Sequence, residues 1–399
     1  MKYESFFEKK LFFYVFFSTF VLFLRILRPY NTLNMPNKLI YSRLYKWYEN
    51  HGRTLPWRET SDPYCIWLSE VILQQTRVAQ GLDYYMRFVA RWPRVEDLAA
   101  AEESEVLREW QGLGYYSRAR NLHKAAQQIV GSGKAPFPQT FEEIRALPGV
   151  GDYTAGAIAS FAYNQPYPAM DGNVYRVVSR LLDIDEPFDT SAGKKRFHRE
   201  IEQLLDRANP RLFNSAIMEF GALYCTPLLG ESVCEECPLS SFCLSKAHGT
   251  AELLPVRKPR PKVRDRWLDY HIYLKPSDIS YQHSEVYTLI RRRENPKDIW
   301  YHLYEFPCEE QFGVPDTENR TQTESAGAQS AQGSKSAVFC TFTHVLSHQR
   351  IHARFILHKV AVLPAIEGAI RVPWSDLDDY ALSRLTVRAI DTLRSFERR

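Results

Sequence analysis

The sequence predicts a mainly α-helical part followed by a smaller α+β part. Apolar residues recur at helical spacing from Leu39 onward, with Ile40, Leu44, Trp47 and Tyr48 forming one stripe. A tight Pro-Gly turn between two apolar, helix-like runs predicts a helical hairpin within residues 147–155. After residue 266 the helical spacing gives way to short β-rich runs. A chain of 399 residues can hold two such domains, each with its own core.

The N-terminal 34 residues have a composition of their own. Leu11 to Leu24 is almost wholly apolar and lies between Lys9, Lys10 and Arg25. The run is shorter than the roughly 18 residues that a membrane-spanning helix needs. It has the basic-then-apolar form of a signal peptide, but no small-residue cleavage site follows it. We expect instead that the protein starts at Met35 and that residues 1–34 are upstream sequence; a membrane tether is the alternative.

The overall charge carries little information about partners. The net charge is +4, but residues 1–34 contribute five basic and two acidic residues, which leaves +1 for the remainder. Local placement says more, because Arg257 to Arg266 holds six basic residues against one Asp, with prolines interleaved. We therefore predict a helical domain over residues 35–245, a basic linker over 246–265 that runs close to phosphates, and a C-terminal domain over 266–399.

The second predicted helix carries the first candidate for chemistry. Leu55-Pro56-Trp57-Arg58 interrupts the first helix, and Asp62-Pro63 opens the next with a capping residue and a proline at the first helical position. Glu70 and Gln74 lie four apart on that helix and share a face, among large apolar residues. Burial there would raise the pKa of Glu70 and suit it to general acid catalysis near neutral pH. A solvated glutamate is the alternative.

A glycine-rich segment and the hairpin follow. Gln111 to Asn121 contains Gly112, Gly114 and paired tyrosines; Tyr115 could stack on a base or simply lie in the core. In the hairpin, Leu147, Pro148, Gly149 and Gly151 precede a run of small residues that starts a helix. Backbone N–H groups at such a helix start can bind a phosphate of any nucleic-acid sequence, although a plain helix connection has the same pattern.

A cysteine group closes the helical part. Cys225, Cys234, Cys237 and Cys243 lie within nineteen residues and could bind zinc or a [4Fe–4S] cluster, both of which prefer soft ligands. Disulfides are a third choice, disfavoured in a cytosolic protein. The other cysteines lack such spacing and are expected to be ordinary buried thiols: Cys65, Cys308 and Cys340.

The C-terminal part has β-rich runs and one helical run. The predicted strands cover 267–274, 286–290, 337–342 and 351–358, and helical spacing covers 377–396. Residues 316–335 are poor in hydrophobic residues and rich in Ser, Thr, Gln, Gly and Ala, which predicts a disordered loop.

Two of these motifs together resemble a known family. Leu-Pro-Gly-Val-Gly with a downstream Asp171 resembles the helix-hairpin-helix DNA glycosylases, and Trp-Leu-Ser-Glu-Val-Ile-Leu-Gln-Gln-Thr resembles the MutY branch, the adenine glycosylases. The resemblance implies that Glu70 protonates the departing adenine and that Asp171 lies at the excision site. It implies hairpin contacts with DNA, a [4Fe–4S] cluster on the four cysteines, and a fold made of a mainly α helix-hairpin-helix core plus a C-terminal α+β Nudix-like domain.

The same resemblance assigns further roles. Trp57, Arg58 and Leu73 would line the adenine pocket, with Gln74 beside it, and Gln75 and Tyr115 would wedge into the duplex next to the partner base. Tyr153 and Asn173 are candidates for hydrogen bonds around the carboxylates. Relatives that resemble endonuclease III have a Lys where this chain has Tyr153, and its amine forms a Schiff base. A phenol cannot do this, so we expect base removal without strand cleavage.

Two features differ from the family or match it less closely. The family spacing is Cys-x6-Cys-x2-Cys-x5-Cys, whereas the first gap here is eight residues long, so we expect a rearranged loop around the cluster. The C-terminal resemblance depends on residues 300–307 and on Leu346-Ser347-His348, where the family often has Phe-Ser-His. The C-terminal part lacks the helix with paired Arg-Glu and Glu-Glu that binds the metal in a working Nudix hydrolase. We therefore expect it to recognise DNA, with Ser347 and His348 reading the base opposite adenine.

The sequence thus predicts a monomeric adenine DNA glycosylase of base excision repair, located in the cytoplasm at the nucleoid. Its expected partner is double-stranded DNA with adenine opposite 8-oxoguanine or guanine, and no obligate protein partner is inferred. The alternatives are a pyrimidine-directed helix-hairpin-helix glycosylase and a non-catalytic mismatch-binding protein. Glu70 with Asp171 argues against the second, and the long C-terminal domain argues against the first.

Overall fold

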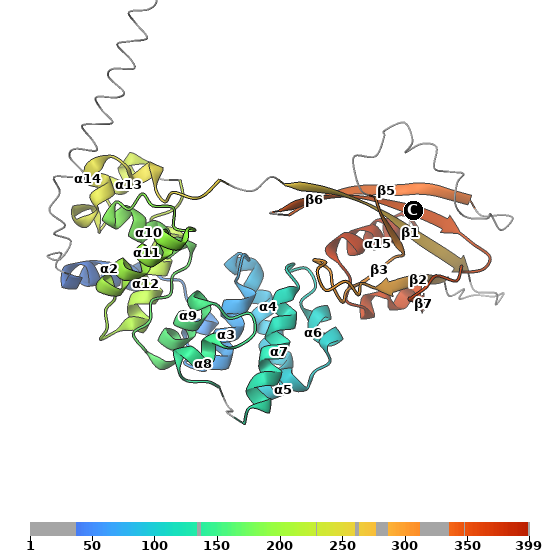
Figure 1. Ribbon diagram of the computed structural model, residues 1–399, viewed down its shortest axis with the longest axis horizontal. Helices are drawn as coiled ribbons and strands as arrows, with labels where there is room; N and C mark the ends of the chain where they lie inside the picture. The colour runs from blue at the N-terminus through green and yellow to red at the C-terminus, as the bar shows by residue number, and fades with distance from the viewer. Residues whose placement is uncertain are drawn as a thin grey trace, which may run out of the picture. The chain divides into compact units, whose positions relative to one another are not determined.

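The computed structural model describes residues 37–133, 137–228, 230–259, 263–276, 286–311, 335–346 and 348–397. The predicted extension over 1–34, the predicted disordered loop apart from Lys335, and Ser347 lie outside these residues. The chain forms two compact units, each built from separate stretches of sequence (Figure 1). Among the described residues, no helix combines the length and the apolar character that crossing a bilayer requires.

The first unit consists of residues up to 52, 173–185 and 215–255. Its first helix buries Ile40, Leu44 and Trp47, and the Trp47 ring packs edge-on against Phe220 with ring centroids 5.0 Å apart. Three of the four residues of the predicted stripe therefore form the buried face of that helix, and the fourth, Tyr48, is partly buried. Its helical elements are α2 (Asn37–His51), α10 (Gly172–Leu182), most of α12 (Pro210–Leu223), α13 (Glu231–Glu235), η3 (Ser240–Phe242), α14 (Leu244–His248) and η4 (Ala251–Leu253).

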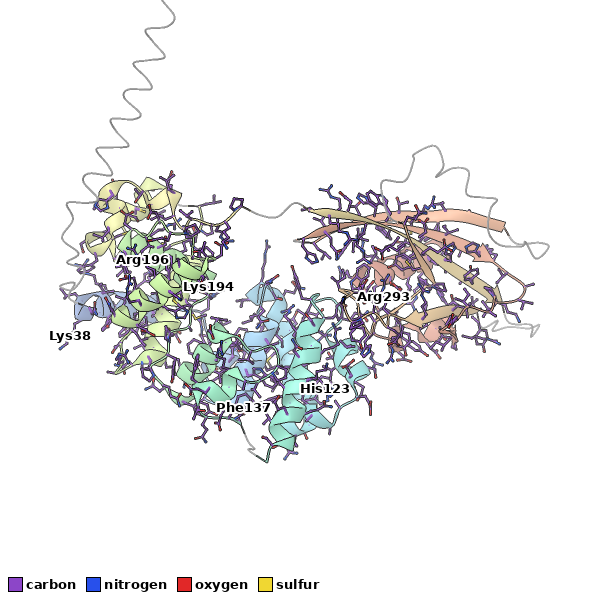
Figure 2. The ribbon with its side chains drawn as sticks, viewed as in Figure 1. Lys38, His123, Phe137, Lys194, Arg196 and Arg293 are labelled. Carbon is purple, nitrogen blue, oxygen red and sulfur yellow. The ribbon has the colours of Figure 1, made fainter. Side chains whose placement is uncertain are left out.

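The second unit consists of residues 53–172, 186–214 and 256–399 and contains both a helical part and a β-sheet part. Buried aromatic side chains fill the helical part; Phe137, labelled in Figure 2, packs at a tilt on Trp67. Its helices are η2 (Pro56–Arg58), α3 (Pro63–Ile72), α4 (Val78–Arg91), α5 (Val95–Ala100), α6 (Glu103–Glu109), α7 (Ser117–Gly131), α8 (Phe141–Arg145), α9 (Asp152–Tyr163) and α11 (Ser191–Leu204).

The starts of the helices that carry the site follow local chemistry. At α3, the Asp62 side chain accepts a hydrogen bond of 2.8 Å from the Tyr64 amide, and Pro63 occupies the first helical position, as predicted. At α8, Thr140 and Glu143 form a reciprocal capping box. The hairpin between α8 and α9 contains Gly149 at φ +76°, and a side chain at that position would collide with Asn121. Glycine is therefore required in this turn.

In the described residues, the C-terminal part is a mixed seven-stranded sheet with a helix. Its elements are β1 (Arg264–Pro276), β2 (Val286–Arg292), β3 (Tyr304–Glu305), β4 (Cys308–Gln311), β5 (Lys335–Val345), β6 (Gln349–Lys359), β7 (Ala369–Pro373), η5 (Trp374–Asp379) and α15 (Arg384–Glu397). The path β3-β2-β1-β6-β5 is joined by β4 on β1 and β7 on β2. Strands β1 and β6 are parallel from Arg264↔Gln349 to Leu274↔Lys359, and the other strand pairs are antiparallel. Arg388 of α15 lies over the Phe342 ring of β5, which packs this helix on the sheet.

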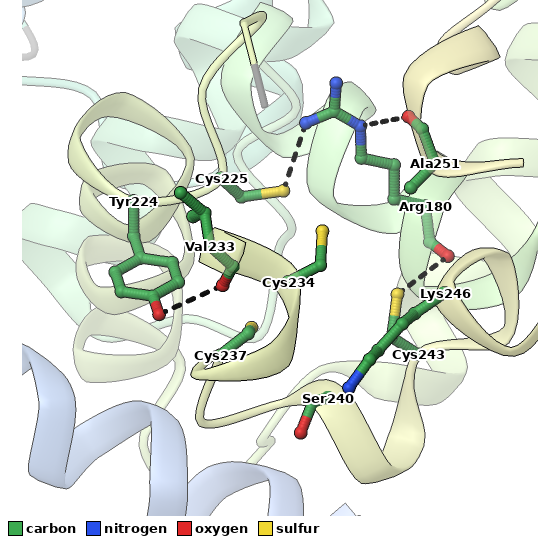
Figure 3. A pocket seen from close by; sticks show the side chains of 10 residues that line it. All are labelled: Arg180, Tyr224, Cys225, Val233, Cys234, Cys237, Ser240, Cys243, Lys246 and Ala251. Carbon is green, nitrogen blue, oxygen red and sulfur yellow. Dashed lines mark hydrogen bonds between the residues drawn. The ribbon is translucent and has the colours of Figure 1, made fainter. Parts of the chain in front are cut away.

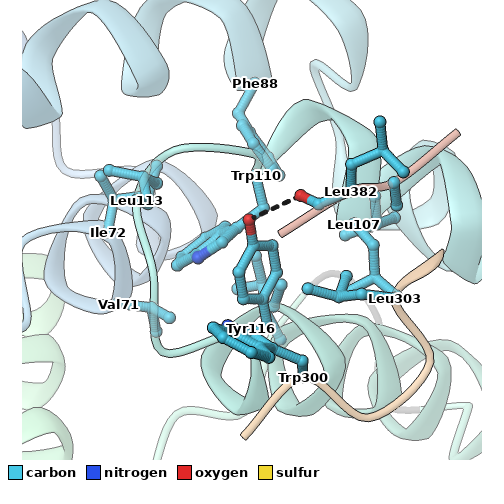
Figure 4. Close-up of a cluster of buried hydrophobic side chains, with 14 of the residues drawn as sticks. Val71, Ile72, Phe88, Leu107, Trp110, Leu113, Tyr116, Trp300, Leu303 and Leu382 are labelled. Atoms are coloured by element: carbon cyan, nitrogen blue, oxygen red, sulfur yellow. Dashed lines mark hydrogen bonds between the residues drawn. The ribbon is translucent and has the colours of Figure 1, made fainter. Parts of the chain in front are cut away.

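One hydrophobic cluster joins the helical part of the second unit to the sheet part. Figure 4 shows Tyr116 of the helical part among Trp300, Leu303 and Leu382 of the sheet part. The Tyr116 hydroxyl donates to the Leu382 carbonyl at 3.3 Å, and the Leu382 amide donates to the Gln111 side-chain oxygen at 3.1 Å. The two parts of this unit thus share a core as well as hydrogen bonds.

The predicted elements of the C-terminal part are largely confirmed, with two corrections. All four predicted strands are present; β2 extends beyond the predicted range at its C-terminal end, and the other three extend beyond it at both ends. The helix predicted from residue 377 is wrong in its first turns, because 374–379 form a 3-10 helix and the α-helix begins at Arg384, after Ser383 Oγ accepts from the Thr386 amide at 3.2 Å. Cys65, Cys308 and Cys340 are free but only partly buried, not fully buried as expected.

Candidate active site

Glu70 lies on a helix that is buried on nearly every side. In α3 each residue from Ile66 to Ile72 is buried, and Glu70 is 7% exposed. Loss of hydration disfavours the carboxylate, so burial raises the pKa of Glu70 to about 7. Near neutral pH such a group exists in both protonation states, which is the property that a proton donor needs.

Two other groups surround this carboxyl. The Tyr153 hydroxyl, from the first turn of α9, donates to Glu70 Oε2 at 2.5 Å, and this bond opposes the effect of burial on the Glu70 pKa. Asp171, directly before α10, lies close enough for its negative charge to raise the pKa of both Glu70 and Tyr153. Burial raises the pKa of Tyr153 further, so the phenol stays neutral and acts as a donor. The structure therefore brings together a buried carboxyl group with a raised pKa, a neutral phenol and a second carboxyl group.

The segment before α3 is held in place by arginines. Trp57 is 8% exposed and its ring packs edge-on against Tyr85 at 5.1 Å. Arg58 donates to the Arg53 carbonyl at 3.0 Å, and its positive charge lowers the pKa of Glu70. Arg211 donates to the carbonyls of Arg58 and Thr60 at 3.2 and 2.6 Å. These contacts fix a short 3-10 turn, Pro56–Arg58, next to Glu70.

Residues that follow Glu70 line the turn at the end of α3. Leu73 packs directly under Gly81 of α4, where any side chain would collide with it. Gln74 donates to Thr154 Oγ1 of α9 at 3.4 Å, which links the α3 turn to the helix that carries Tyr153. Gln75 is exposed and has φ +55°, in the left-handed region that a side chain rarely adopts.

Tyr115 has the same unusual backbone. It is 39% exposed at φ +48°, on the loop between Gly114 and α7. Its neighbour Tyr116 is the residue of this pair that lies in the core, at 3% exposure. The alternative that Tyr115 is a core residue is therefore wrong.

The hairpin between α8 and α9 is open to solvent. Gly149 and Gly151 are exposed, whereas Leu147 is buried at 4% and anchors the turn. The first-turn N–H groups of α9 have no partner within the helix, so they are available to an anion. Asp152 and Arg145 form an exposed ion pair across the turn. The hairpin can therefore hold a phosphate without a base-specific contact.

The four clustered cysteines line one pocket of the first unit (Figure 3). None forms a disulfide. Arg180 donates to Cys225 Sγ at 3.4 Å, and Cys243 Sγ donates to the Arg180 carbonyl at 3.4 Å. Within the described residues, no three His, Cys, Asp or Glu side chains are arranged to hold a single ion. Four free thiols line one pocket together with the cationic side chains Arg180 and Lys246. This lining fits a group with several metal ions, each of which binds a soft thiolate ligand.

Asn173 belongs to the same unit as the cysteines. Its side-chain oxygen accepts from Arg176 Nη2 at 2.8 Å, and Arg176 also donates to the carbonyls of Cys225 and Gly221 at 2.7 and 2.6 Å. Asn173 packs on Gly221, where a larger residue would collide with its backbone. Arg176 thus connects the segment just after Asp171 with the first residue of the cysteine group.

In the C-terminal part, only one of the two predicted base-reading residues is described. His348 is exposed, and its carbonyl accepts from the Arg264 amide at 3.1 Å, which fixes the β5–β6 loop against the start of β1. Ser347 lies outside the described residues. At the linker, the Lys258 amide donates to Asp189 at 3.0 Å and Arg257 lies over the Phe188 ring, while both side chains remain exposed.

Three arginines missed by the sequence analysis hold these segments: Arg118, Arg176 and Arg211. Their partners are mainly backbone carbonyls far away in the chain, so no spacing pattern could have revealed them. Arg118 does lie within the glycine-rich segment from Gln111 to Asn121 that contains Tyr115. An arginine within an otherwise apolar helix face was the available signal.

The hairpin and the buried acid on α3 place the chain in the class of helix-hairpin-helix DNA repair proteins. Residues 68–206 match the family model of the HhH-GPD superfamily base excision DNA repair protein. The adenine DNA glycosylase of Buchnera aphidicola subsp. Baizongia pistaciae is 33% identical over 274 residues, which is 68% of this chain and 74% of that protein. The chain therefore belongs to the adenine DNA glycosylase family, as its resemblance to the MutY branch predicted.

Other relatives are longer. The Mus musculus adenine DNA glycosylase is 40% identical over 233 residues, 56% of this chain and 45% of that protein, so the chain spans about half the length of such mammalian relatives. The solved structure of a thermostable thymine-DNA glycosylase covers 53% of this chain and 97% of its own, at 27% identity and a TM-score of 0.48.

Proposed function

We propose that this protein removes adenine mispaired with 8-oxoguanine or guanine by hydrolysing its N-glycosidic bond. One observation carries the proposal: the carboxyl of Glu70 is buried, has a pKa of about 7 and lies beside Tyr153 and Asp171. A protonated and an ionised carboxyl group around one bond suit a reaction through an oxocarbenium-like state. Membership of the adenine DNA glycosylase family supports adenine as the base that is released. The burial and surroundings of Glu70 support this residue as the acid that protonates it.

The reaction starts with extrusion of the adenine, because its ring nitrogens cannot reach Glu70 within the base stack. Trp57, Arg58 and Leu73 then hold the base, with Gln74 at the edge of the pocket, and Gln75 and Tyr115 fill the gap in the duplex. Glu70 gives a proton to the purine, so that it leaves as a neutral base. As the bond from C1′ to the purine nitrogen breaks, the Asp171 carboxylate offsets the positive charge that grows on the sugar. A water molecule then adds to C1′ and loses a proton to solvent, which leaves the abasic sugar in the strand.

Tyr153 has a role distinct from that of a lyase lysine. Its hydroxyl donates to Glu70 and stabilises the carboxylate that remains after proton transfer. A phenol cannot form a Schiff base, so we propose that the reaction stops at an abasic site in an intact strand. Asn173 acts indirectly: it accepts a hydrogen bond from Arg176, and this bond fixes the start of α10 next to Asp171.

We propose that Cys225, Cys234, Cys237 and Cys243 hold a [4Fe–4S] cluster. Its thiolate bonds would join the loop of residues 225–243 to the pocket, and the cluster is capable of electron transfer. Burial raises the pKa of Cys237 to about 12, so this thiol ionises only when a metal charge compensates. Arg180 already offers a positive group to Cys225.

We propose that the C-terminal domain, Nudix-like in shape, reads the base opposite adenine through His348 and Ser347, and that Lys258 and Arg260 contact phosphates. The substrate is then double-stranded DNA, and we expect a monomer that acts at the nucleoid. Replacing Ser347 and His348 together by Ala is expected to lower the preference for 8-oxoguanine over guanine by about five- to a hundredfold, the worth of a lost bidentate contact. Substituting Lys258 and Arg260 should instead weaken binding to all duplexes alike and reduce its salt dependence.

The direct test is release of free base from defined duplexes. Duplexes with adenine opposite 8-oxoguanine, guanine or thymine, and a thymine:guanine duplex, are incubated with the full chain and the released bases are separated. We expect free adenine from the first two and an alkali-labile site in that strand. Release of thymine would favour the pyrimidine-directed alternative, and tight binding without release would favour a mismatch-binding protein.

A further inference from the structure

We propose that Arg118 is a positioning residue that holds the two duplex-wedging loops, those of Gln75 and Tyr115, as one rigid unit. The inference rests on the proposed function, which makes Gln75 and Tyr115 the residues that fill the space left by the adenine. Neither the family membership nor the acid at Glu70 assigns any role to Arg118.

The hydrogen bonds of Arg118 divide between the two loops. Its Nη1 donates to the carbonyls of Val71, Ile72 and Gln74 at 3.0, 2.9 and 2.6 Å. Its Nη2 donates to the carbonyls of Leu113 and Gly114 at 3.3 and 3.1 Å. One planar group therefore joins the residues just before Gln75 to those just before Tyr115.

The first loop needs this cation because it ends a helix. The last carbonyls of α3 have no partner within the helix, and they form the negative end of its dipole. Leu73 donates its amide to Ser69, and after that the chain turns away into Gln75 at φ +55°. The guanidinium satisfies the carbonyls left at this end, which fixes the direction in which the chain leaves the helix.

The second loop is fixed by its carbonyls in the same way. The Gln111 carbonyl accepts from the Tyr84 hydroxyl at 2.7 Å, and the Gly114 carbonyl accepts from both Trp110 and Arg118. With these oxygens turned into the protein, Tyr115 is left 39% exposed at φ +48°. Both wedge candidates thus have a backbone that ordinary residues avoid, and it persists because the surrounding contacts determine it.

The surroundings of Arg118 exclude a buried ion pair as the reason for its position. It is 9% exposed, and burial lowers its pKa to about 10. No carboxylate among the described residues pairs with it; its acceptors are five backbone carbonyls and, at 3.5 Å, the Thr76 hydroxyl, and it lies over the rings of Trp110 and Tyr115. A buried cation without an acidic partner is costly, and the acceptors that offset this cost are those of the two loops.

The test compares two DNA substrates on one protein preparation. Both contain an adenine opposite guanine, but in the first the pair is flanked by paired bases, and in the second it lies in an unpaired internal loop. Only the first requires the wedge to replace stacking, which is a substantial part of base binding. The ratio of the two single-turnover rates is independent of the fraction of folded protein, because misfolded chains lower both rates equally.

We expect Arg118→Met to lower the rate on the paired duplex about tenfold or more, and the rate on the loop substrate by about twofold at most. Arg118→Lys keeps the charge but can serve only one loop, so its ratio should lie between those of Met and wild type. If the Met variant is poorly soluble, the Lys variant carries the comparison. Arg120→Met is the matched control, because Arg120 is 8% exposed on the same helix but donates to the Tyr301 carbonyl and to neither wedge loop.

The possible results are distinct. An equal loss on both substrates, or no loss on either, overturns the inference, because Arg118 would then serve the fold or nothing. A second readout is 2-aminopurine placed next to the opposite guanine, whose fluorescence should rise on binding wild type and Arg120→Met but not Arg118→Met. If wild type releases no adenine from either substrate, the proposed function fails instead, whatever the variants do.

Discussion

Replacing Tyr153 by Phe is expected to move the alkaline limb of adenine release to higher pH. The Tyr153 hydroxyl donates to Glu70 Oε2 at 2.5 Å and so stabilises the ionised form of Glu70, while burial favours the protonated form and raises the pKa to about 7. Without the phenol, burial is less opposed. A hydrogen bond to a charged group is worth about 1.5–3 kcal/mol, so the Glu70 pKa should rise by about 1–2 units.

The sign follows from the role of Glu70. A general acid works in its protonated form, so the wild-type rate should fall as the pH rises through about 7. In Tyr153→Phe the fall should begin about 1–2 pH units higher. The variant is also a weaker acid, so its rate at low pH should be lower by up to about tenfold.

Single-turnover excision from an adenine:8-oxoguanine duplex, followed from about pH 5 to about pH 10, measures both effects. Tyr163→Phe is the matched control, since Tyr163 lies at the other end of α9 and its hydroxyl donates to the Pro138 carbonyl at 3.0 Å. Its pH profile should match that of wild type. A Tyr153→Phe limb that stays in place, or moves to lower pH, would refute the reasoning about Glu70.

Three further predictions follow from the same contacts. Because folding raises the Glu70 pKa from 4.5 to about 7, the stability that its protonated form contributes is complete below the unfolded pKa and is lost as the pH rises through 7. The free energy of unfolding of Glu70→Gln in urea, relative to that of wild type, should therefore rise by up to about 3 kcal/mol between pH 5 and pH 8. A difference between the two proteins that does not change with pH would contradict the burial argument. Protein purified without oxygen should be brown with about four irons per chain, whereas colourless protein with stoichiometric zinc would show that the longer first gap has changed the metal. Borohydride should trap little wild-type protein on DNA and much more Tyr153→Lys; efficient trapping of wild type would mean that a lysine elsewhere performs lyase chemistry.

The sequence predicted the local features of this fold best. The Asp62-Pro63 helix start, the stripe of α2 and four strands of the sheet follow from neighbouring residues, whose propensities act over short distances. The short strands β3, β4 and β7 were missed because their register depends on partners far away in the chain. The late start of α15 was missed because Ser383 ends the preceding irregular segment with a cap.

In the candidate site, too, local features could be predicted from the sequence, whereas contacts between distant residues needed the structure. Apolar neighbours on α3 pointed to a buried Glu70 with a raised pKa but left a solvated glutamate as the alternative, and the family resemblance favoured burial, which the structure has. Tyr153, 83 residues away in sequence, was a candidate partner only through the family resemblance, and the structure was needed to give its hydrogen bond to Glu70 Oε2. Arg118, Arg176 and Arg211 bond to backbone carbonyls, which every residue possesses, so their partners leave no mark in the sequence.

The central claim is that Glu70 is the acid that releases adenine, and Glu70→Gln tests it most directly. The amide keeps the shape of the side chain but has no proton to give, so adenine release from an adenine:8-oxoguanine duplex should fall by about a hundredfold or more while duplex binding stays near that of wild type. Glu142→Gln, the same change at an exposed position in α8, should retain full activity. A Glu70→Gln variant that keeps more than about a tenth of the wild-type rate would contradict the account, because a general acid contributes at least that much.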